Sequence, residues 1–314
     1  MSNSPDIYLK GPDSLSAVLT HLQLAAEIYV SGDFCGAWAV DTSGSRRMPF
    51  HILSRGEAWL HVEGDSPRSL AAGDLVFFPR DEKHIMASSA AMPAEQQINA
   101  GFDPQQPPGA HLTCGFFEFN NPAAWPLLDF LPPVIVLDMS HMSATPQFRT
   151  LIDLMIGELQ AAEPGFYAAI NKLAHLLFMQ IIRQQITTGT VKEGLLAAMF
   201  DPRLGRALTA IHMYPQRHWT LQSLAAEAAM GRSSFASRFS ELTATTPMQY
   251  LTSWRMQQAI VLLQSSSMGL AEISERCGYE SEPAFRKAFR KIIGKPPGAF
   301  RSRNSTTVTQ GLFQ

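Results

Sequence analysis

The stretch AEISERCGYESEPAFRKAFRKIIGKPPGAF, residues 271–300, contains two short apolar stripes separated by Cys-Gly-Tyr. Ile273 and Cys277 are four residues apart and therefore share one helical face. The same spacing puts Phe285 and Phe289 on one face of a following helix. Four cations surround the second stripe: Arg286, Lys287, Arg290 and Lys291. This pattern has two interpretations, a solvated helix face or a helix that lies against phosphates.

An earlier stretch, LQSLAAEAAMGRSSFASRFSELTATTPMQY at residues 221–250, repeats the pattern. Leu224 aligns with Ile273, and Phe239 aligns with Phe289 once one extra residue in the second copy is allowed for. A repeat on this scale indicates one supersecondary unit that is used twice.

Each copy is predicted to be a helix, a tight turn and a second helix, the arrangement in which the second helix enters the major groove of DNA. Gly278 suits a left-handed residue that ends the first helix of the second copy. Ser233 and Ser281 are placed to cap the second helices. The charge distribution favours a polyanionic partner for this region alone, since residues 201–314 carry 14 Lys and Arg against 7 Asp and Glu, whereas residues 1–200 carry 11 against 20.

The C-terminal third resembles the DNA-binding domain of AraC/XylS transcription regulators. The resemblance rests on W-T-L-x-x-L-A at 219–225, on P-M-x-Y-L at 247–251, and on I-x-E-x-C-G-Y-E-S-E-x-A-F-R-K-A-F at 273–289. It implies that two helix-turn-helix units within 201–303 read successive major-groove segments, about one helical turn (~34 Å) apart. A connecting helix over roughly Pro247–Gln264 would fix that spacing.

The resemblance also implies which side chains face DNA. Base-facing positions fall on Ser233, Ala236, Ser237 and Arg238 in the first unit, and on Glu282, Pro283, Arg286 and Lys287 in the second. Arg286 is the strongest candidate base reader, because Arg can donate two hydrogen bonds to guanine. Arg232 and Arg238 are the long cations of the first unit, and Arg290 and Lys291 are expected to meet phosphates.

The acidic N-terminal part shows short strand patterns, rich in aromatic and aliphatic residues, over 34–119. Within it, LAAGDLVFFPRDEKHI at 70–85 resembles the second motif of cupin barrels, although Asp81 stands where Gly is usual. Three spaced residues of the motif are present: Gly73, Pro79 and His84. The resemblance implies a cupin-like sensor barrel over residues 1–140.

Four residues in or beside the predicted strands are candidates for a sensor: Cys35, His51, His84 and Cys114. Two thiolates and two imidazoles would complete a tetrahedral zinc site, and the two thiols could instead be oxidised. Ordinary core packing and the lining of an organic-ligand pocket are the alternatives. A cavity for such a ligand could be lined by about half of the barrel's aromatic residues: Phe34, Trp38, Trp59, Phe77, Phe116 and Phe117.

Residues 145–188 show apolar side chains at helical spacing, with Pro164-Gly165 as a break between two helices. These helices are expected to support a homodimer. Their apolar residues should be buried within the protomer or between protomers: Leu151, Leu154, Leu176, Leu177 and Met179.

The chain is therefore predicted to be a multidomain α+β protein with an N-terminal cupin-like β-barrel, a helical linker and a C-terminal all-α domain with two helix-turn-helix units. The expected boundaries are 1–140 for the barrel, 141–200 for the linker and dimerisation segment, 201–303 for the DNA-binding domain, and 304–314 for a tail.

The expected function is sequence-specific transcription regulation on double-stranded DNA, controlled by an unknown small effector, a metal or thiol oxidation. The family resemblance implies an activator that contacts RNA polymerase. A cupin metalloenzyme fused to a DNA-binding module is the alternative, disfavoured because residues 41–50 lack the His and Glu ligands of metal-binding cupins; a barrel that serves only assembly is another. With three cysteines and neither a secretory signal nor an apolar membrane span in the sequence, a cytoplasmic protein is expected.

Overall fold

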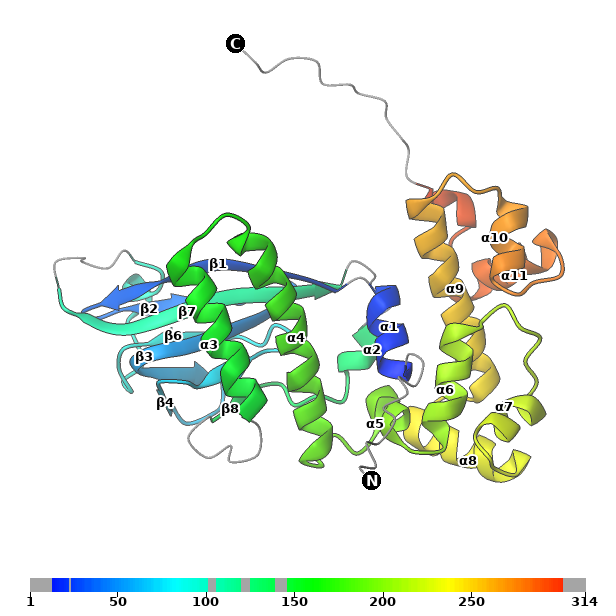
Figure 1. Ribbon diagram of the computed structural model, residues 1–314, viewed down its shortest axis with the longest axis horizontal. Coiled ribbons are helices and arrows are strands. Elements are labelled where there is room, and N and C mark those ends of the chain that lie inside the picture. The colour runs from blue at the N-terminus through cyan, green and yellow to red at the C-terminus, as the bar shows by residue number, and fades with distance from the viewer. Residues whose placement is uncertain (1–12, 23, 101–105, 120–124, 139–145, 302–314) are drawn as a thin grey trace, which may run out of the picture. The chain divides into compact units, whose positions relative to one another are not determined.

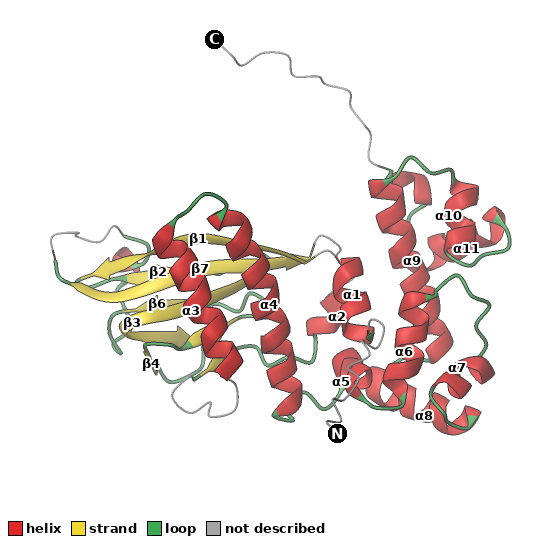
Figure 2. Ribbon diagram, viewed as in Figure 1, coloured by secondary structure: helices red, strands yellow, loops and turns green. Residues whose placement is uncertain are grey.

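The computed structural model describes residues 13–22, 24–100, 106–119, 125–138 and 146–301. It divides into two compact units. The barrel unit is Leu22–Lys192, and the helical unit joins residues 13–21 with residues 193–301. Figure 2 shows the strands gathered in the barrel unit. Among the described residues, no helix combines the length and apolar character that a bilayer crossing requires.

The barrel unit is built from antiparallel strands around β3, which is the longest of them. The strands are β1 (Leu24–Cys35), β2 (Ala39–Asp41), β3 (Met48–Val62), β4 (Arg68–Ala71), β5 (Leu75–Phe77), β6 (His84–Ala87), β7 (Pro108–Phe119) and β8 (Ile135–Leu137). The first half of β3 pairs with β5 and β7, and its second half pairs with β4 and β6. The change of partners coincides with a register shift between Leu53 and Arg55.

Gly56 lets β3 bend at this change of partners. Its φ is +80°, and a Cβ added there would lie 1.9 Å from the backbone oxygen of Gly109 in β7. Only glycine combines a left-handed backbone with so close an approach. The bend allows one strand to serve both halves of the barrel wall.

The inner face of the barrel is apolar. Opposite residues of paired strands share a face, so the pairing of His51 with both Val76 and Cys114 places all three inside. The inner core cluster consists of Phe34, Trp38, Leu53, Ala58, Leu60, Leu70, Val76, Phe78, Met86, Ala110, Leu112 and Cys114. Two of the six aromatic residues expected at a cavity, Phe34 and Trp38, therefore belong to this interior.

Two helices cover the opposite face of the sheet, as Figure 1 shows: α3 (Pro146–Ala161) and α4 (Phe166–Thr187). The ring of Phe178 in α4 lies 6.0 Å from that of Phe77 and 5.2 Å from that of Phe117. Phe77 and Phe117 therefore pack beneath a helix and do not line the barrel interior. Side chains alternate between the two faces of a strand, so some aromatic residues face the barrel interior and others face the helices. Which residues do so could not be assigned from the sequence.

The helical unit contains α1 (Ser14–Leu22), α5 (Gly194–Phe200), α6 (Leu204–Met213), α7 (Leu221–Glu227), α8 (Arg232–Thr243), α9 (Pro247–Ser265), α10 (Leu270–Arg276) and α11 (Glu282–Ile293). Short helical segments complete the fold: η1 (Glu95–Gln97), α2 (Trp125–Leu128) and η3 (Pro297–Phe300). Helices α7 and α8 form the first helix-turn-helix unit, and α10 and α11 form the second. The expected connecting helix is α9.

The N-terminal helix α1 belongs to the helical unit, although its residues fall in the segment expected to form the barrel. Ser14 Oγ lies 3.1 Å from His212 Nδ1 in α6, and both side chains are buried. The segment 141–200, expected as a linker, is divided in the structure. Helices α3 and α4 pack with the barrel, and α5 packs with the helical unit.

The two expected helix caps have different outcomes. Ser281 is the N-cap of α11, and its side chain accepts a hydrogen bond from the Ala284 backbone N–H. The expectation for Ser233 is wrong, because α8 begins at Arg232 and its N-cap is Gly231. Within the repeat Gly231 is equivalent to Ser281, so Ser233 lies inside the first turn.

Candidate nucleic-acid interface and barrel site

The exposed face of α8 carries most of the candidate DNA-contacting residues of the first unit. Phe235 and Phe239 are fully buried, so the other side of the helix faces solvent. Ser233 and Ser237, one turn apart, are exposed, and Ala236 is half-buried beside them. A hydroxyl can bond any base edge, and an alanine methyl suits the methyl group of thymine. Arg232, at the first position of α8, is also exposed.

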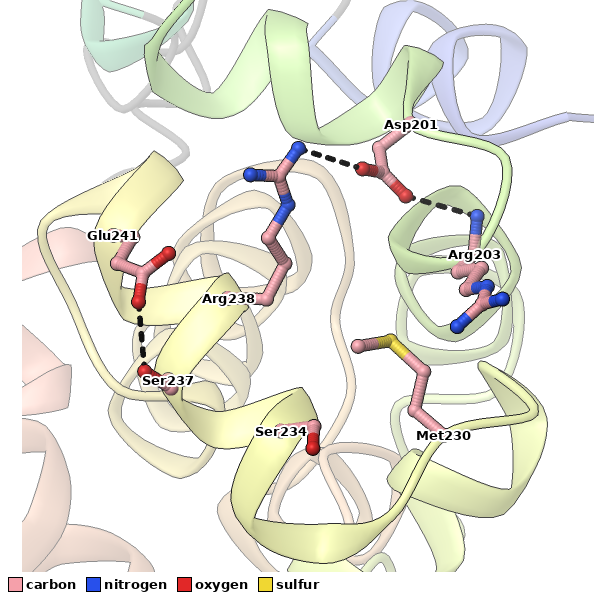
Figure 3. A pocket seen from close by; sticks show the side chains of 7 residues that line it. All are labelled: Asp201, Arg203, Met230, Ser234, Ser237, Arg238 and Glu241. Carbon is pink, nitrogen blue, oxygen red and sulfur yellow. Dashed lines mark hydrogen bonds and ion pairs between the residues drawn. The ribbon is translucent and has the colours of Figure 1, made fainter.

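Arg238 lies on a different side of α8. At about 100° per residue, it is turned by roughly that angle from Ser237. Its Nη2 lies 3.4 Å from Asp201 Oδ2, as Figure 3 shows, while Asp201 Oδ1 accepts hydrogen bonds from the backbone N–H groups of Arg203 and Leu204. Burial opposes the ionisation of Asp201, but these hydrogen bonds outweigh it and lower its pKa. Arg238 thus connects α8 to the beginning of α6.

The second unit offers a comparison for the position of Arg238 in α8. Ala288 of α11 is the repeat equivalent of Arg238, and it packs half-buried against the core of the second unit. In α8 the equivalent side chain is exposed, since Arg238 keeps 51% of its side-chain surface accessible while its end reaches Asp201. In the first copy, the long side chain of Arg238 forms an ion pair with Asp201.

Helix α11 presents the candidate contacts of the second unit. Phe285 and Phe289 are fully buried, whereas Pro283, Arg286 and Lys287 are exposed and Glu282 is half-buried. Arg286 Nε donates a hydrogen bond of 2.7 Å to Glu282 Oε1, one turn earlier on the helix. Arg290 and Lys291 are exposed in the last turn, where their charges also complement the helix dipole.

A polar cluster lies among the apolar side chains of the barrel interior. His51 Nε2 is 3.0 Å from His84 Nε2, and Thr42 Oγ1 is 3.2 Å and 2.9 Å from these two atoms. His84 Nδ1 lies 2.7 Å from the backbone oxygen of Glu82, so Nδ1 carries the proton that it donates. The ring of His84 stacks on Phe78 with 3.6 Å between centroids.

These contacts determine the tautomers of both imidazoles. Because neutral His84 has its proton on Nδ1, its Nε2 is an acceptor, and the facing His51 Nε2 must carry a hydrogen. Thr42 can accept from His51 and donate to His84. His51 Nδ1 is then an unprotonated acceptor, buried without a hydrogen-bond partner in the described part of the chain.

Burial keeps these groups uncharged. It is the main cause that lowers the pKa of His51 well below its ordinary value, with His84 adding to the effect, and it also lowers the pKa of His84. Burial raises the pKa of the Cys114 thiol to about 12. Cys114 is therefore a protonated thiol, and a thiol reacts with oxidants far more slowly than a thiolate does.

Comparison with known proteins assigns the chain to a family. The cupin family model matches residues 13–187, and a model described as a helix-turn-helix domain matches residues 224–303. A putative AraC-like transcription regulator of Streptomyces lividans is 32% identical over 92% of this chain and 98% of its own length. The chain belongs to the AraC family of transcription regulators.

Two further relatives cover the whole chain and the DNA-binding part. The HTH-type transcriptional regulator AlkR of Acinetobacter baylyi is 27% identical over 93% of this chain and 100% of its own. The crystal structure of the AdpA DNA-binding domain, in complex with a target DNA, is 36% identical over 32% of this chain and 90% of that domain, with a TM-score of 0.30.

Membership of the AraC family confirms the predicted fold class and the predicted function as a DNA-binding transcription regulator. The relatives are regulators and not enzymes. The protein thus combines a cupin barrel with a double helix-turn-helix domain, as its two sequence resemblances implied.

A sensor built from all four candidates would require their side chains to converge, and the two cysteines do not meet this condition. Cys35 lies opposite Pro108 of β7, whereas Cys114 of β7 lies opposite Val30 of β1. About six residues of β7 (~20 Å) therefore separate the positions of the two cysteines along the strand. A disulfide requires Cα atoms within about 7 Å. All three cysteines of the chain are free.

The zinc alternative does not fit this geometry. The structure brings His51 and His84 together, with Cys114 on the strand position opposite His51. In the described ranges, no three His, Cys, Asp or Glu side chains are grouped so that they could hold a metal ion. Strand register, which the sequence does not reveal, separates Cys35 from the other candidates.

Sequence reasoning missed Thr42, which joins the two imidazoles, and Asp201, which holds Arg238. Thr42 lies within residues 41–50, a segment in which only the absence of His and Glu was informative. Asp81, in contrast, carried a readable signal. It stands at a position where cupins use Gly, and its φ of +57° is the left-handed conformation that glycine would adopt.

Proposed function

We propose that α8 and α11 enter successive segments of the major groove of double-stranded DNA, about one helical turn (~34 Å) apart. One observation carries this proposal: both helices bury a pair of phenylalanines and turn the opposite face to solvent, within one compact unit. Ser233 and Ser237 stand on that face in α8, and Arg286 and Lys287 stand on it in α11.

Arg286 is the proposed guanine reader. Its guanidinium is half-exposed and pairs with Glu282 across one helical turn, an ion pair that costs little to exchange for a base. Glu282 would then be free to accept a hydrogen bond from a cytosine amino group. Arg290 and Lys291 would neutralise phosphates, which strengthens binding without adding sequence information.

Binding to duplexes selected from a random pool by the full chain tests this assignment. Arg286→Ala should weaken binding by ~1–3 kcal/mol and relax discrimination at one base pair. Arg290→Ala should weaken binding to all sequences about equally, because phosphates are common to them. Unchanged affinity and unchanged sequence preference for Arg286→Ala would show that α11 is not the reading helix.

The proposed signal site is the cluster of Thr42, His51 and His84. The buried acceptor His51 Nδ1 offers a hydrogen bond to a small effector with a donor group, and the neighbouring side chains supply apolar contact. A switch by direct disulfide formation has no support, given the separation of Cys35 and Cys114 along β7. Effector binding at this cluster would modulate DNA binding or activation.

A reporter fused to the selected operator tests the signal site across a panel of small molecules and metal salts. His51→Gln should abolish the response that the wild-type protein shows, while the purified variant keeps its DNA affinity. A response of normal size in His51→Gln would remove the cluster as the sensor.

We further propose a homodimeric activator that works with RNA polymerase in the cytoplasm, as the family resemblance implies. Leu154 of α3 and Leu176 of α4 support self-association, because both remain exposed on helices whose neighbours Leu151 and Leu177 are buried. The free cysteines fit a reducing compartment.

A further inference from the structure

Helix α9 belongs to the cores of both helix-turn-helix units. In its first half, the ring of Tyr250 lies 5.7 Å from that of Phe239, and the ring of Trp254 lies 4.5 Å from that of His212. In its second half, Met256, Ala259, Ile260 and Leu263 enter the core cluster of the second unit. Residue 255 therefore stands where one core ends and the other begins.

Arg255 makes contacts on both sides of this boundary. Its Nε donates to the backbone oxygen of Pro215 at 2.8 Å, and its Nη2 donates to that of Arg217 at 2.8 Å. Both carbonyls belong to the loop that leads into α7 of the first unit. The same guanidinium lies 5.7 Å from the ring centroid of Tyr279, in the turn of the second unit.

Gly278 lets the turn of the second unit approach this loop. Its φ is +76°, and an added Cβ would lie 2.7 Å from Arg255 Nη2 and 2.8 Å from the backbone oxygen of Gln216. The backbone of Gly278 in the second unit thus lies directly against that of Gln216 in the first, and the Arg255 guanidinium lies beside this contact. Any side chain at position 278 would push the loop, the guanidinium or both away.

A planar guanidinium is suited to this position. It donates in a fixed fork to two carbonyls and lies over an aromatic ring at the same time, so it resists both sliding and rotation. Lysine, with a single rotatable ammonium on a flexible stem, lacks that fork and cannot hold the two carbonyls in one fixed geometry. The contacts therefore restrain the orientation of the two units and not only their distance.

We propose that Arg255 and Gly278 form a joint that fixes the separation and rotational phase of α8 and α11, so that the protein selects DNA by the spacing of its two half-sites. This inference rests on the proposed reading of two major-groove segments. One added base pair shifts a half-site by ~3.4 Å and rotates it by roughly a tenth of a turn. A rigid joint cannot follow that change unless the DNA is distorted.

The test uses the full chain and a pool of random-sequence duplexes. Selection by the wild-type protein should return two conserved blocks at one fixed spacing. Binding to that duplex, and to versions with one base pair inserted or removed between the blocks, is then measured for each variant. Wild type should lose ~10-fold or more in affinity on either change, the scale of a modest DNA distortion.

Arg255→Met and Gly278→Ala should reduce that loss below ~3-fold, because a flexible joint can follow the half-site. Arg255→Lys, which keeps the charge but replaces the fork with a single donor nitrogen, should give an intermediate loss. Arg276→Met is the matched control, since it removes an exposed cation that pairs with Glu272 within α10, and its spacing preference should equal that of the wild type. Spacing preference is the informative readout, because general destabilisation lowers all affinities alike.

The outcomes separate the joint from the function on which it rests. A single conserved block in the wild-type selection would overturn two-segment reading and the joint together. Two blocks at fixed spacing, with that preference undiminished in Gly278→Ala and Arg255→Lys, would overturn the joint alone. These two variants decide the matter even where circular dichroism shows Arg255→Met to be unfolded.

Discussion

At the scale of single residues, the buried contact between His51 and His84 restricts the protonation of both side chains. Each side chain is only 1% exposed, and the two imidazoles face one another across 3.0 Å with Thr42 beside them. A proton added to either ring would place a charge in an apolar interior and bring two N–H groups face to face. Both rings are therefore neutral in the folded protein.

The first prediction concerns the pH dependence of barrel stability. Both imidazoles have a lowered pKa when folded, mainly through burial, whereas unfolded histidine titrates near 6.5. Below about pH 6.5 the unfolded state therefore binds more protons, and the free energy of unfolding should fall by up to ~1.4 kcal/mol per pH unit for each group. Above that pH the two groups contribute no slope.

Urea unfolding of the full chain between pH 5 and 8, followed by tryptophan fluorescence, measures this slope. His51→Gln and His84→Gln should flatten it below pH 6.5, and His218→Gln, on the exposed surface of the helical unit, is the control. Equal slopes in wild type and in both barrel variants would contradict the neutral, buried pair.

The residue scale also shows what the sequence could reveal about the sites. His84 was identifiable from a spaced motif, and the exposed cations of α11 from the charge pattern of one helix. The Thr42–His51–His84 contact was not identifiable, because it joins three separate strands or loops. The family resemblance grouped Arg238 with Ser233 and Ser237 as base-facing positions, although a single residue step turns its side chain toward Asp201.

At the scale of elements, local signals predicted helices well and the sheet poorly. The expected connecting helix Pro247–Gln264 agrees with α9 to within one residue. Its start was predictable because Thr246 and Pro247 form a strong helix start. The separation of Cys35 from Cys114 depends instead on the register of β1 against β7, with its shifts near Tyr29 and at Phe34. Such shifts depend on packing between distant strands.

The second prediction compares equivalent ends of the two repeated helices. Ser281→Ala should lower the free energy of unfolding by about 0.5–1 kcal/mol, because it removes the side-chain acceptor at the N-cap of α11. Ser233→Ala should change it by less than about 0.5 kcal/mol, since Ser233 is exposed within the first turn of α8. Thermal unfolding of the full chain, followed by circular dichroism at 222 nm, measures both. Equal effects of the two substitutions would contradict the assigned helix starts.

At the scale of the whole molecule, the two units differ in charge, and both expose some large apolar side chains. The helical unit carries most of the excess cations, while the barrel unit leaves Leu154, Tyr167 and Leu176 exposed on α3 and α4. Scattered apolar residues are common on surfaces, but the presence of three on a single helix pair supports the proposed dimer surface. The sequence showed that these helices are apolar, and the structure shows which of their residues the barrel leaves uncovered.

The third prediction concerns self-association. Leu154→Glu combined with Leu176→Glu should convert the full chain from dimer to monomer, because burying two carboxylates in an interface is unfavourable. Sedimentation velocity at several concentrations measures the change. The control is Glu158→Gln, which alters a charge on α3 without adding one. A dimer of unchanged stability in the double variant would exclude this surface as the interface.

The measurement that tests the central claim most directly is protection of guanine N7 from methylation, on a duplex selected from random sequence by the full chain. Guanine N7 lies in the major groove. Two helices reading successive segments should protect guanines in two clusters about 10–10.5 base pairs apart, on one face of the duplex. At saturating protein, Arg286→Ala should lose protection in one cluster and keep it in the other. One cluster in the wild type, or two clusters that Arg286→Ala leaves intact, would contradict the account.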